Sequence, residues 1–218
     1  MPAKKAARYG EAAFDVLYLC TALTLGLVLL ISAKTVVSEM FGLMALLLVA
    51  GDACHLVPRI QSAITGERER FLKRLGYGKL AASVGMTVFY VLLWHIGLLA
   101  YSVKTAGTWT FIVYALAAVR AVLCLLPQNR WSEGREDGAW NIYRNIPFTL
   151  LGLAVGILFF LYRNAEPGGL PLMWLAILLS FAFYLPVVLF AEKRPALGML
   201  MLPKSCAYVW IIVMGLSL

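Results

Sequence analysis

The fold is decided by the stretch Gly51-Asp52-Ala53-Cys54-His55-Leu56-Val57-Pro58-Arg59, which ends an apolar segment made of Leu, Met, Val and Ala. Asp52 and His55 lie three residues apart, so on a helix they project from one face, and Arg59 continues that face a turn later. Ionisable side chains inside an apolar segment are costly and need a reason. The surroundings of this stretch therefore decide what its charged groups can do.

The composition of the chain indicates a membrane protein. Hydrophobic residues make up 62% of the 218 residues and charged residues only 14%, and the mean hydropathy is +0.83. A chain of this length cannot bury so much apolar surface in one core and keep a soluble exterior. The formal net charge is +8, but the Lys and Arg residues fall in short clusters between apolar segments. No basic face interleaved with aromatic side chains is present, so we do not expect nucleic-acid binding.

Seven apolar segments are long enough to cross a hydrocarbon layer as helices, which requires about 20 residues each. We therefore predict an all-α, integral membrane bundle of seven transmembrane helices, with residues 1–218 forming a single domain. Short connections that contain Gly, Pro or charged residues separate most of the segments. The predicted spans are 13–32, 39–58, 79–101, 108–127, 145–163, 171–191 and 198–217.

The distribution of Lys and Arg predicts the orientation of the bundle. Fifteen of these residues fall on the side of the N-terminus, against Lys34, Lys104 and Arg163 on the other side. Basic connections stay in the cytoplasm, so we expect a cytoplasmic N-terminus and a C-terminus outside. We interpret the first span as a retained helix rather than a signal peptide. With no eukaryotic targeting signal visible, we expect a bacterial inner (plasma) membrane. The fifteen are Lys4, Lys5, Arg8, Arg59, Arg68, Arg70, Lys73, Arg74, Lys79, Arg130, Arg135, Arg144, Lys193, Arg194 and Lys204.

This orientation assigns a depth to the charged residues inside the spans. At about 1.5 Å per residue, Asp52 lies roughly 20 Å from Glu39, and Arg120 lies roughly 18 Å from Thr108. The two side chains are therefore expected at one level, where an Asp52–Arg120 ion pair is feasible. His95 is expected near the opposite end of its span, far from His55, so the two histidines do not predict a metal site. We expect no metal or cofactor.

Other polar residues collect in the same half of the bundle and predict a cavity that opens to the cytoplasm. Asp52 and His55 are the candidate catalytic residues. The candidate substrate-binding residues are Arg120, Arg144, Asn145, Tyr184 and Tyr208, and Asp15, Tyr18, Asn141, Ser83, Thr87 and Tyr90 accompany them.

A purely structural interpretation of the same residues stays open. Asp52 and Arg120 would then form a structural ion pair beside an interfacial histidine. Asn141, Arg144 and Asn145 would be an ordinary cluster at the start of a helix. We interpret Trp94, Trp131, Trp140 and Trp174 as anchors at the membrane interface.

The order of several motifs resembles the YhhN-like lysoplasmalogenase family of polytopic membrane proteins. Gly51-Asp52 followed by Leu56-Val57-Pro58 is similar to the family's Gly-Asp-x-x-Leu-x-Leu-Pro run, and Leu75-Gly76-Tyr77-Gly78 and Lys193-Arg194-Pro195-Ala196 are similar to later parts. The resemblance implies hydrolysis of the vinyl-ether bond of a lysoplasmalogen by an intramembrane acid/base site. It implies membrane lipids as partners and a lysophospholipid as the substrate.

Under this hypothesis, Asp52 donates a proton or activates water and His55 is the second proton-transfer group. Arg120 sets the charge on Asp52, and Arg144 meets the lipid head group. The sequence does not indicate an oligomeric state.

A transporter or a lipid- or ligand-binding membrane protein without catalysis is the alternative function. A buried Asp–Arg pair is also what a proton-coupled carrier would use. The chain shows no inverted repeat and no matching pair of broken helices, which argues against a carrier. A retinal protein is disfavoured, because Lys204 is expected only at the inner edge of the seventh span.

Overall fold

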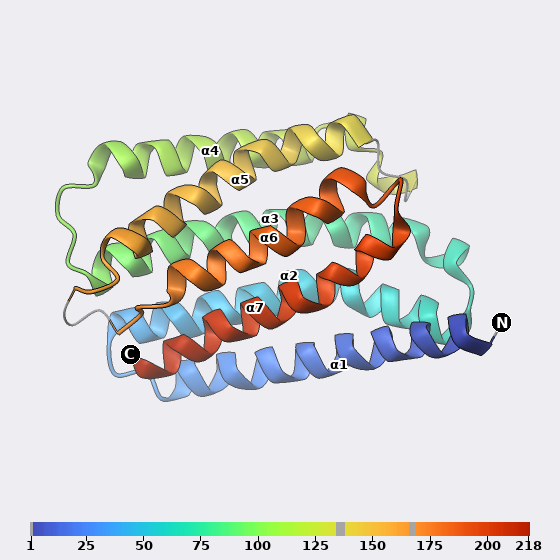
Figure 1. The fold of residues 1–218 in the computed structure, drawn as a ribbon, viewed down its shortest axis with the longest axis horizontal. Helices are drawn as coiled ribbons and strands as arrows, with labels where there is room; N and C mark the ends of the chain where they lie inside the picture. Colours follow the sequence, from blue (N-terminus) through green and yellow to red (C-terminus); the bar gives the residue numbers. More distant parts are fainter. Residues whose placement is uncertain (1, 134–137, 166–168) are drawn as a thin grey trace.

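The computed structural model describes residues 2–133, 138–165 and 169–218, so Arg135 of the basic clusters lies outside the described residues. Seven α-helices in this part of the chain are long and apolar enough to cross a membrane, either alone or, for the last, with its flanking turns (Figure 1). The predicted all-α class is confirmed in the described residues, as are seven helices of spanning length and composition, which indicate an integral membrane protein. The helices are α1 Pro2–Ile31, α2 Val36–Thr65, α3 Arg68–Ala100, α4 Gly107–Leu125, α5 Gly138–Leu161, α6 Met173–Phe190 and α7 Met201–Met214.

Four short 3₁₀ helices complete the described elements. Two lie between α4 and α5, namely η1 (Pro127–Asn129) and η2 (Trp131–Glu133). The other two flank α7, with η3 (Pro195–Leu200) before it and η4 (Gly215–Ser217) after it.

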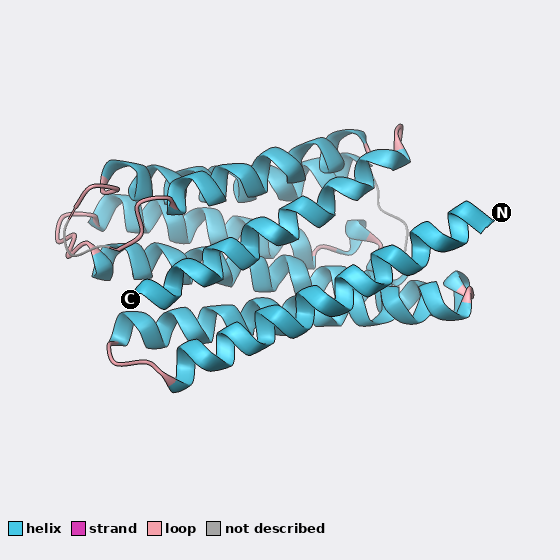
Figure 2. Ribbon diagram, turned by 60° about the horizontal axis from the view of Figure 1, so that its bottom comes forward, coloured by secondary structure: helices cyan, strands magenta, loops and turns pink. Residues whose placement is uncertain are grey.

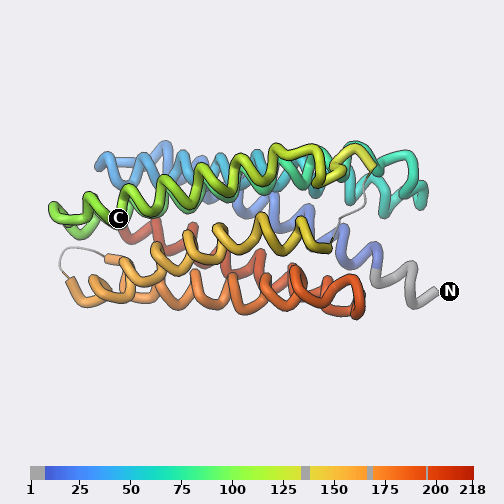
Figure 3. Tube along the Cα trace, turned by 90° about the horizontal axis from the view of Figure 1, so that it is seen from above, coloured from blue at the N-terminus to red at the C-terminus, as the bar shows by residue number. Residues whose placement is uncertain are grey.

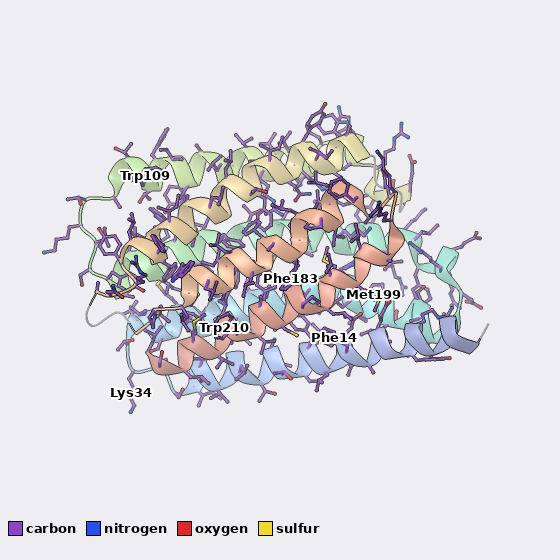
Figure 4. The ribbon with its side chains drawn as sticks, in the orientation of Figure 1. Phe14, Lys34, Trp109, Phe183, Met199 and Trp210 are labelled. Carbon is purple, nitrogen blue, oxygen red and sulfur yellow. The ribbon has the colours of Figure 1, made fainter. Side chains whose placement is uncertain are left out.

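The helices run side by side along the long axis of the molecule, with loops at both ends (Figure 2). Each helix contacts the next one in the chain, and α1 also contacts α7. The two termini lie toward opposite ends (Figure 3). Lys34 and Trp109 mark one end, and Met199 in the α6–α7 connection lies toward the other (Figure 4). We call the latter the basic end, because the N-terminus and the α2–α3 connection lie there (Figure 1).

The helices at the basic end are longer than the apolar spans predicted for them. Helix α2 begins with a capping box, in which the Thr35 side chain accepts from the backbone of Ser38, and it continues to Thr65. Gly66 then adopts a left-handed conformation with φ of 79°, which ends the helix. Helix α3 starts two residues later at Arg68. This tight connection fixes α2 and α3 as antiparallel neighbours.

Glycines allow α2 and α3 to pack closely around residues 51–59 of α2. A Cβ atom added at Gly78 of α3 would overlap the backbone carbonyl of Cys54 on α2. A Cβ atom at Gly51 would already lie 3.7 Å from Gly85. Asp52 and His55 therefore stand on a helix whose backbone is held firmly against α3.

The end opposite the basic clusters is filled by apolar and aromatic side chains, as the sequence predicts. Phe89, Phe159 and Ile177 are fully buried there in the described part of the protein. Two polar groups of α3 are bonded to α4: Trp94 donates to Thr110 Oγ1 at 3.1 Å, and His95 Nε2 lies 2.6 Å from the Tyr114 hydroxyl. The interpretation of Trp94 as an interfacial anchor is wrong, because only 3% of its surface is exposed.

Candidate functional site: a polar cavity inside the bundle

A cavity of about 920 Å³ lies inside the basic half of the bundle. It extends from Gly66 and Arg68 at the α2–α3 connection inward to Arg120 and Phe148. Pockets that hold small molecules have volumes of roughly 300 to 1,000 Å³. Each of the seven helices in the described chain contributes to the wall, for example through Asp15, Asp52, Ser83, Arg120, Phe148, Tyr184 and Lys204.

Helices α1 and α2 form one wall of the cavity with matched polar stripes. The Tyr18 hydroxyl donates to Asp52 Oδ2 at 2.6 Å. One to two turns further toward the basic end, Arg59 is ion-paired with Glu11 at 2.7 Å and with Asp15 at 3.6 Å. The helices are antiparallel, so positions 11, 15 and 18 of α1 meet positions 59 and 52 of α2 in order. This register places the Asp52 carboxylate inside the bundle and the ion pairs nearer the end of the cavity.

Asp52 and Arg120 both line the cavity, but they do not form an ion pair. The ion pairs among the described residues join Arg59 to Glu11 and Asp15, and Arg70 to Glu67. The Asp52–Arg120 ion pair that the shared depth makes feasible is therefore not formed, although both residues line the same cavity. The cation whose charge interacts with Asp52 is Lys204 of α7.

Arg120 is buried with little to compensate its charge. Its side chain is only 2% exposed, and its guanidinium carbon lies 3.3 Å from the centroid of the Phe148 ring. The Cys124 thiol, one turn further along α4, also contacts the guanidinium. Within the described chain, Nε and Nη1 of Arg120 have no hydrogen-bond partner.

Arg144 is also buried, but its guanidinium is held by amides. Nη1 donates to Asn129 Oδ1 at 3.0 Å and Nη2 donates to Asn141 Oδ1 at 2.9 Å. The guanidinium lies over the Trp131 ring, 4.5 Å from its centroid. Asn129 in turn donates to the Leu126 carbonyl at the end of α4, at 2.9 Å. These contacts match the interpretation of Arg144 as part of a cluster at the start of α5.

Trp131 belongs to this corner and is not an interfacial anchor. It is 8% exposed, and its indole donates to the Cys124 carbonyl at 2.8 Å. Its backbone packs directly on Gly76 of α3, where any Cβ atom would overlap the Trp131 carbonyl. The corner between α4 and α5 is thereby fixed against the start of α3.

The remaining predicted residues lie on α5, α6 and α7. The Tyr184 hydroxyl donates to Asn145 Oδ1 at 2.7 Å, while its ring faces the Lys204 ammonium at 4.9 Å. The Tyr208 ring lies 4.9 Å from the same ammonium. Of the seven candidate residues, Asp52, His55, Arg120, Arg144 and Tyr184 line the cavity; Asn145 and Tyr208, although described, do not.

Two residues have a larger part in the site than the sequence predicts: Lys204, which lines the cavity, and Tyr18, which donates to the cavity residue Asp52. Lys204 lies in the first turn of α7 and lines the cavity together with Asp52 and Arg120. The signal for Tyr18 was present: Glu11, Asp15 and Tyr18 recur at helical spacing, as do Asp52, His55 and Arg59. Matching these two stripes across an antiparallel pair would have found the Tyr18–Asp52 bond.

Fold and site together define a polytopic membrane protein whose helices enclose a polar cavity lined by buried charges. The chain matches no protein-family profile, no curated protein and no solved structure. In the described residues, no group of three or more His, Cys, Asp or Glu side chains is arranged to hold a metal ion.

Proposed function

We propose that this protein is a lysoplasmalogenase-like hydrolase that admits a lysophospholipid into its cavity and cleaves the ether bond with Asp52. The single observation that carries the proposal is where the Asp52 carboxylate lies and which groups contact it. It lines the cavity of about 920 Å³, accepts a hydrogen bond from the Tyr18 hydroxyl at 2.6 Å, and has no ion-pair partner among the described cations. A carboxylate locked in a permanent ion pair would be poorly suited to exchanging protons with a substrate.

The proposed reaction uses two proton-transfer groups on one face of α2. Asp52 gives its proton to the outer vinyl carbon, and the resulting cation is attacked by water at the carbon that carries the oxygen. His55, one turn away on the same wall, accepts the proton of that water. The hemiacetal then breaks at the bond between its carbon and the glycerol oxygen: His55 returns its proton to that oxygen, Asp52 takes the proton of the hemiacetal hydroxyl, and an aldehyde and the glycerophospho head group are released. One water is consumed for each ether bond broken.

The proposal includes an orientation. The basic end of the bundle, where the cavity opens beside Arg68, faces the cytoplasm of a bacterial inner membrane. A reporter fused after Leu218 is then expected to read as extracytoplasmic. A cytoplasmic signal from that fusion would reverse the orientation.

Turnover by the purified protein tests the hydrolase directly. Incubation in an uncharged detergent with alkenyl and acyl lysophospholipids, followed by mass spectrometry, is expected to reveal a long-chain aldehyde from the alkenyl lipid. Asp52→Asn is expected to lower this rate by at least about 100-fold, the usual contribution of a general acid. Glu11→Gln is the matched control, since Glu11 is a cavity carboxylate already paired with Arg59. Equal rates for wild type and Asp52→Asn would refute the assignment.

A lipid- or ligand-binding protein or transporter without catalysis is the second candidate, and Arg120 favours it. A buried guanidinium that lacks a carboxylate is an arrangement that a bound ligand would complete. Binding of a lipid without any release of aldehyde or fatty acid would select this candidate.

A further inference from the structure

The charge of Arg120 is the least compensated feature of the described bundle. The side chain is only 2% exposed, and two of its three guanidinium nitrogens have no hydrogen-bond partner in the described chain. Removing an ion from water is costly unless a counter-charge or hydrogen bonds replace the water. The face of the Phe148 ring, 3.3 Å from the guanidinium carbon, offsets only part of that cost.

A second cation stands in the same cavity. The Lys204 ammonium lies 4.9 Å from the ring centroids of both Tyr184 and Tyr208, and its charge interacts first with Asp52 and then with Arg120. The like charges of Lys204 and Arg120, which line one cavity, repel each other. An anion placed between them would relieve this repulsion.

The carboxylates of the described chain do not form an ion pair with Arg120. Glu11 and Asp15 are paired with Arg59, and Asp52, whose charge interacts with Lys204, is bonded to Tyr18. Seven cationic side chains line the cavity against four carboxylates, so the wall carries a positive excess. The wall is therefore short of negative charge at its inner end.

We infer that Arg120 and Lys204 form a binding site for a phosphate group. The guanidinium offers a planar fork that matches phosphate oxygens, and the ammonium adds a second positive charge. The inference deepens the proposed function, on which it rests for the choice of a lipid as the carrier of the phosphate. Under this inference the lipid head group contacts Lys204 and not Arg144. The two terminal nitrogens of Arg144 already donate to Asn129 and Asn141.

The site predicts an order of ligands. A single-chain phosphate amphiphile would place its phosphate between Arg120 and Lys204 and its chain along the apolar residues of the wall, such as Leu56 and Met86. Inorganic phosphate would satisfy the same charges but would bury no apolar surface. Dodecyl phosphate is therefore expected to bind more tightly than inorganic phosphate, and a dodecyl trimethylammonium cation is not expected to bind there.

Thermal unfolding of the full chain in dodecyl maltoside, at constant ionic strength, tests the site with these three probes. Saturating dodecyl phosphate is expected to raise the unfolding midpoint by about 5 °C. Arg120→Met and Lys204→Met are each expected to weaken binding about tenfold or more, as loss of a charged hydrogen bond requires. Arg163→Met is the matched control, because Arg163 also lies over a phenylalanine ring, at 4.2 Å from Phe160, but does not line the cavity.

The possible outcomes separate this site from the hydrolase. A shift with dodecyl phosphate alone supports a lipid head group as the source, and a shift with inorganic phosphate as well supports a site that also takes the free ion. No shift with either probe, or equal shifts in wild type, Arg120→Met and Lys204→Met, would overturn the site. Phosphate binding without ether cleavage would support the phosphate site and refute the hydrolase. Ether cleavage with unchanged kinetics in Arg120→Met and Lys204→Met would support the hydrolase and refute the phosphate site.

Discussion

Two buried arginines on neighbouring helices differ in how their guanidinium groups are compensated for the loss of water. Arg144 on α5 and Arg120 on α4 are 5% and 2% exposed, and each places its guanidinium over an aromatic ring, of Trp131 and of Phe148. Arg144 donates to two amide oxygens that are themselves fixed by the α4–α5 corner. Arg120 has two nitrogens without hydrogen bonds in the described chain.

The difference shows how a structural arginine is distinguished from one that awaits a ligand. Burial and aromatic stacking are common to both residues, so neither property separates them. The hydrogen bonds do, because a guanidinium whose donors are satisfied by the protein has little left to offer a ligand. The sequence predicts a substrate-binding role for both arginines, since depth and residue type alone do not reveal their hydrogen-bond partners.

Replacing Arg144 is expected to have the largest effect in this comparison. Arg144→Met removes the bonds that Arg144 donates to Asn129 Oδ1 and Asn141 Oδ1. The buried Asn129 oxygen loses this donor, while Asn141 Oδ1 keeps the Asn145 amide at 3.1 Å. Two charged hydrogen bonds of about 1.5 to 3 kcal/mol each predict a loss of about 3 to 6 kcal/mol in the free energy of unfolding. Unfolding in a detergent titration, monitored by tryptophan fluorescence, measures this loss against Arg163→Met. A loss below about 1 kcal/mol would show that the corner does not depend on Arg144.

Replacing Arg120 is expected to act in the opposite direction in phosphate-free detergent. Arg120→Met removes a buried charge whose desolvation cost exceeds the roughly 2 kcal/mol returned by Phe148. We expect the free energy of unfolding to stay unchanged or to rise by up to about 2 kcal/mol. The same titration measures it. A loss larger than about 1 kcal/mol would mean that Arg120 is compensated inside the bundle, as Arg144 is.

The contrast between these arginines also shows what the sequence could reveal. Apolar segment length predicted all seven helices, since a bilayer core dictates that length. The rise per residue predicted that Asp52 and Arg120 share a level, and both line one cavity. The helix rotation that decides whether they touch is set by packing, through close approaches such as Gly78 against Cys54, and no period in the sequence encodes it.

The contacts made by the segments that connect the helices are the part of the structure least predictable from the sequence. Asn129 and Trp131 lie between α4 and α5, outside every predicted span, yet they are 0% and 8% exposed and contact the Arg144 guanidinium. Their roles follow from the backbone of η1 and η2, where Arg130 adopts a positive φ of 48°. Turn geometry of this kind is a tertiary property that hydropathy does not report.

Tyr184 connects the two arginine environments, and its replacement is expected to have the smallest effect. Its hydroxyl donates to Asn145 Oδ1 beside the Arg144 cluster, and its ring faces the Lys204 ammonium beside Arg120. Tyr184→Phe removes the hydroxyl and keeps the ring, so the free energy of unfolding should fall by about 1 kcal/mol. The midpoint shift produced by dodecyl phosphate should remain within error of wild type, because the proposed site uses the charges of Arg120 and Lys204. Loss of that shift in Tyr184→Phe, with only a small change in stability, would place the phenolic hydroxyl in the phosphate site. The surroundings of Arg120 and Arg144 would then form one site.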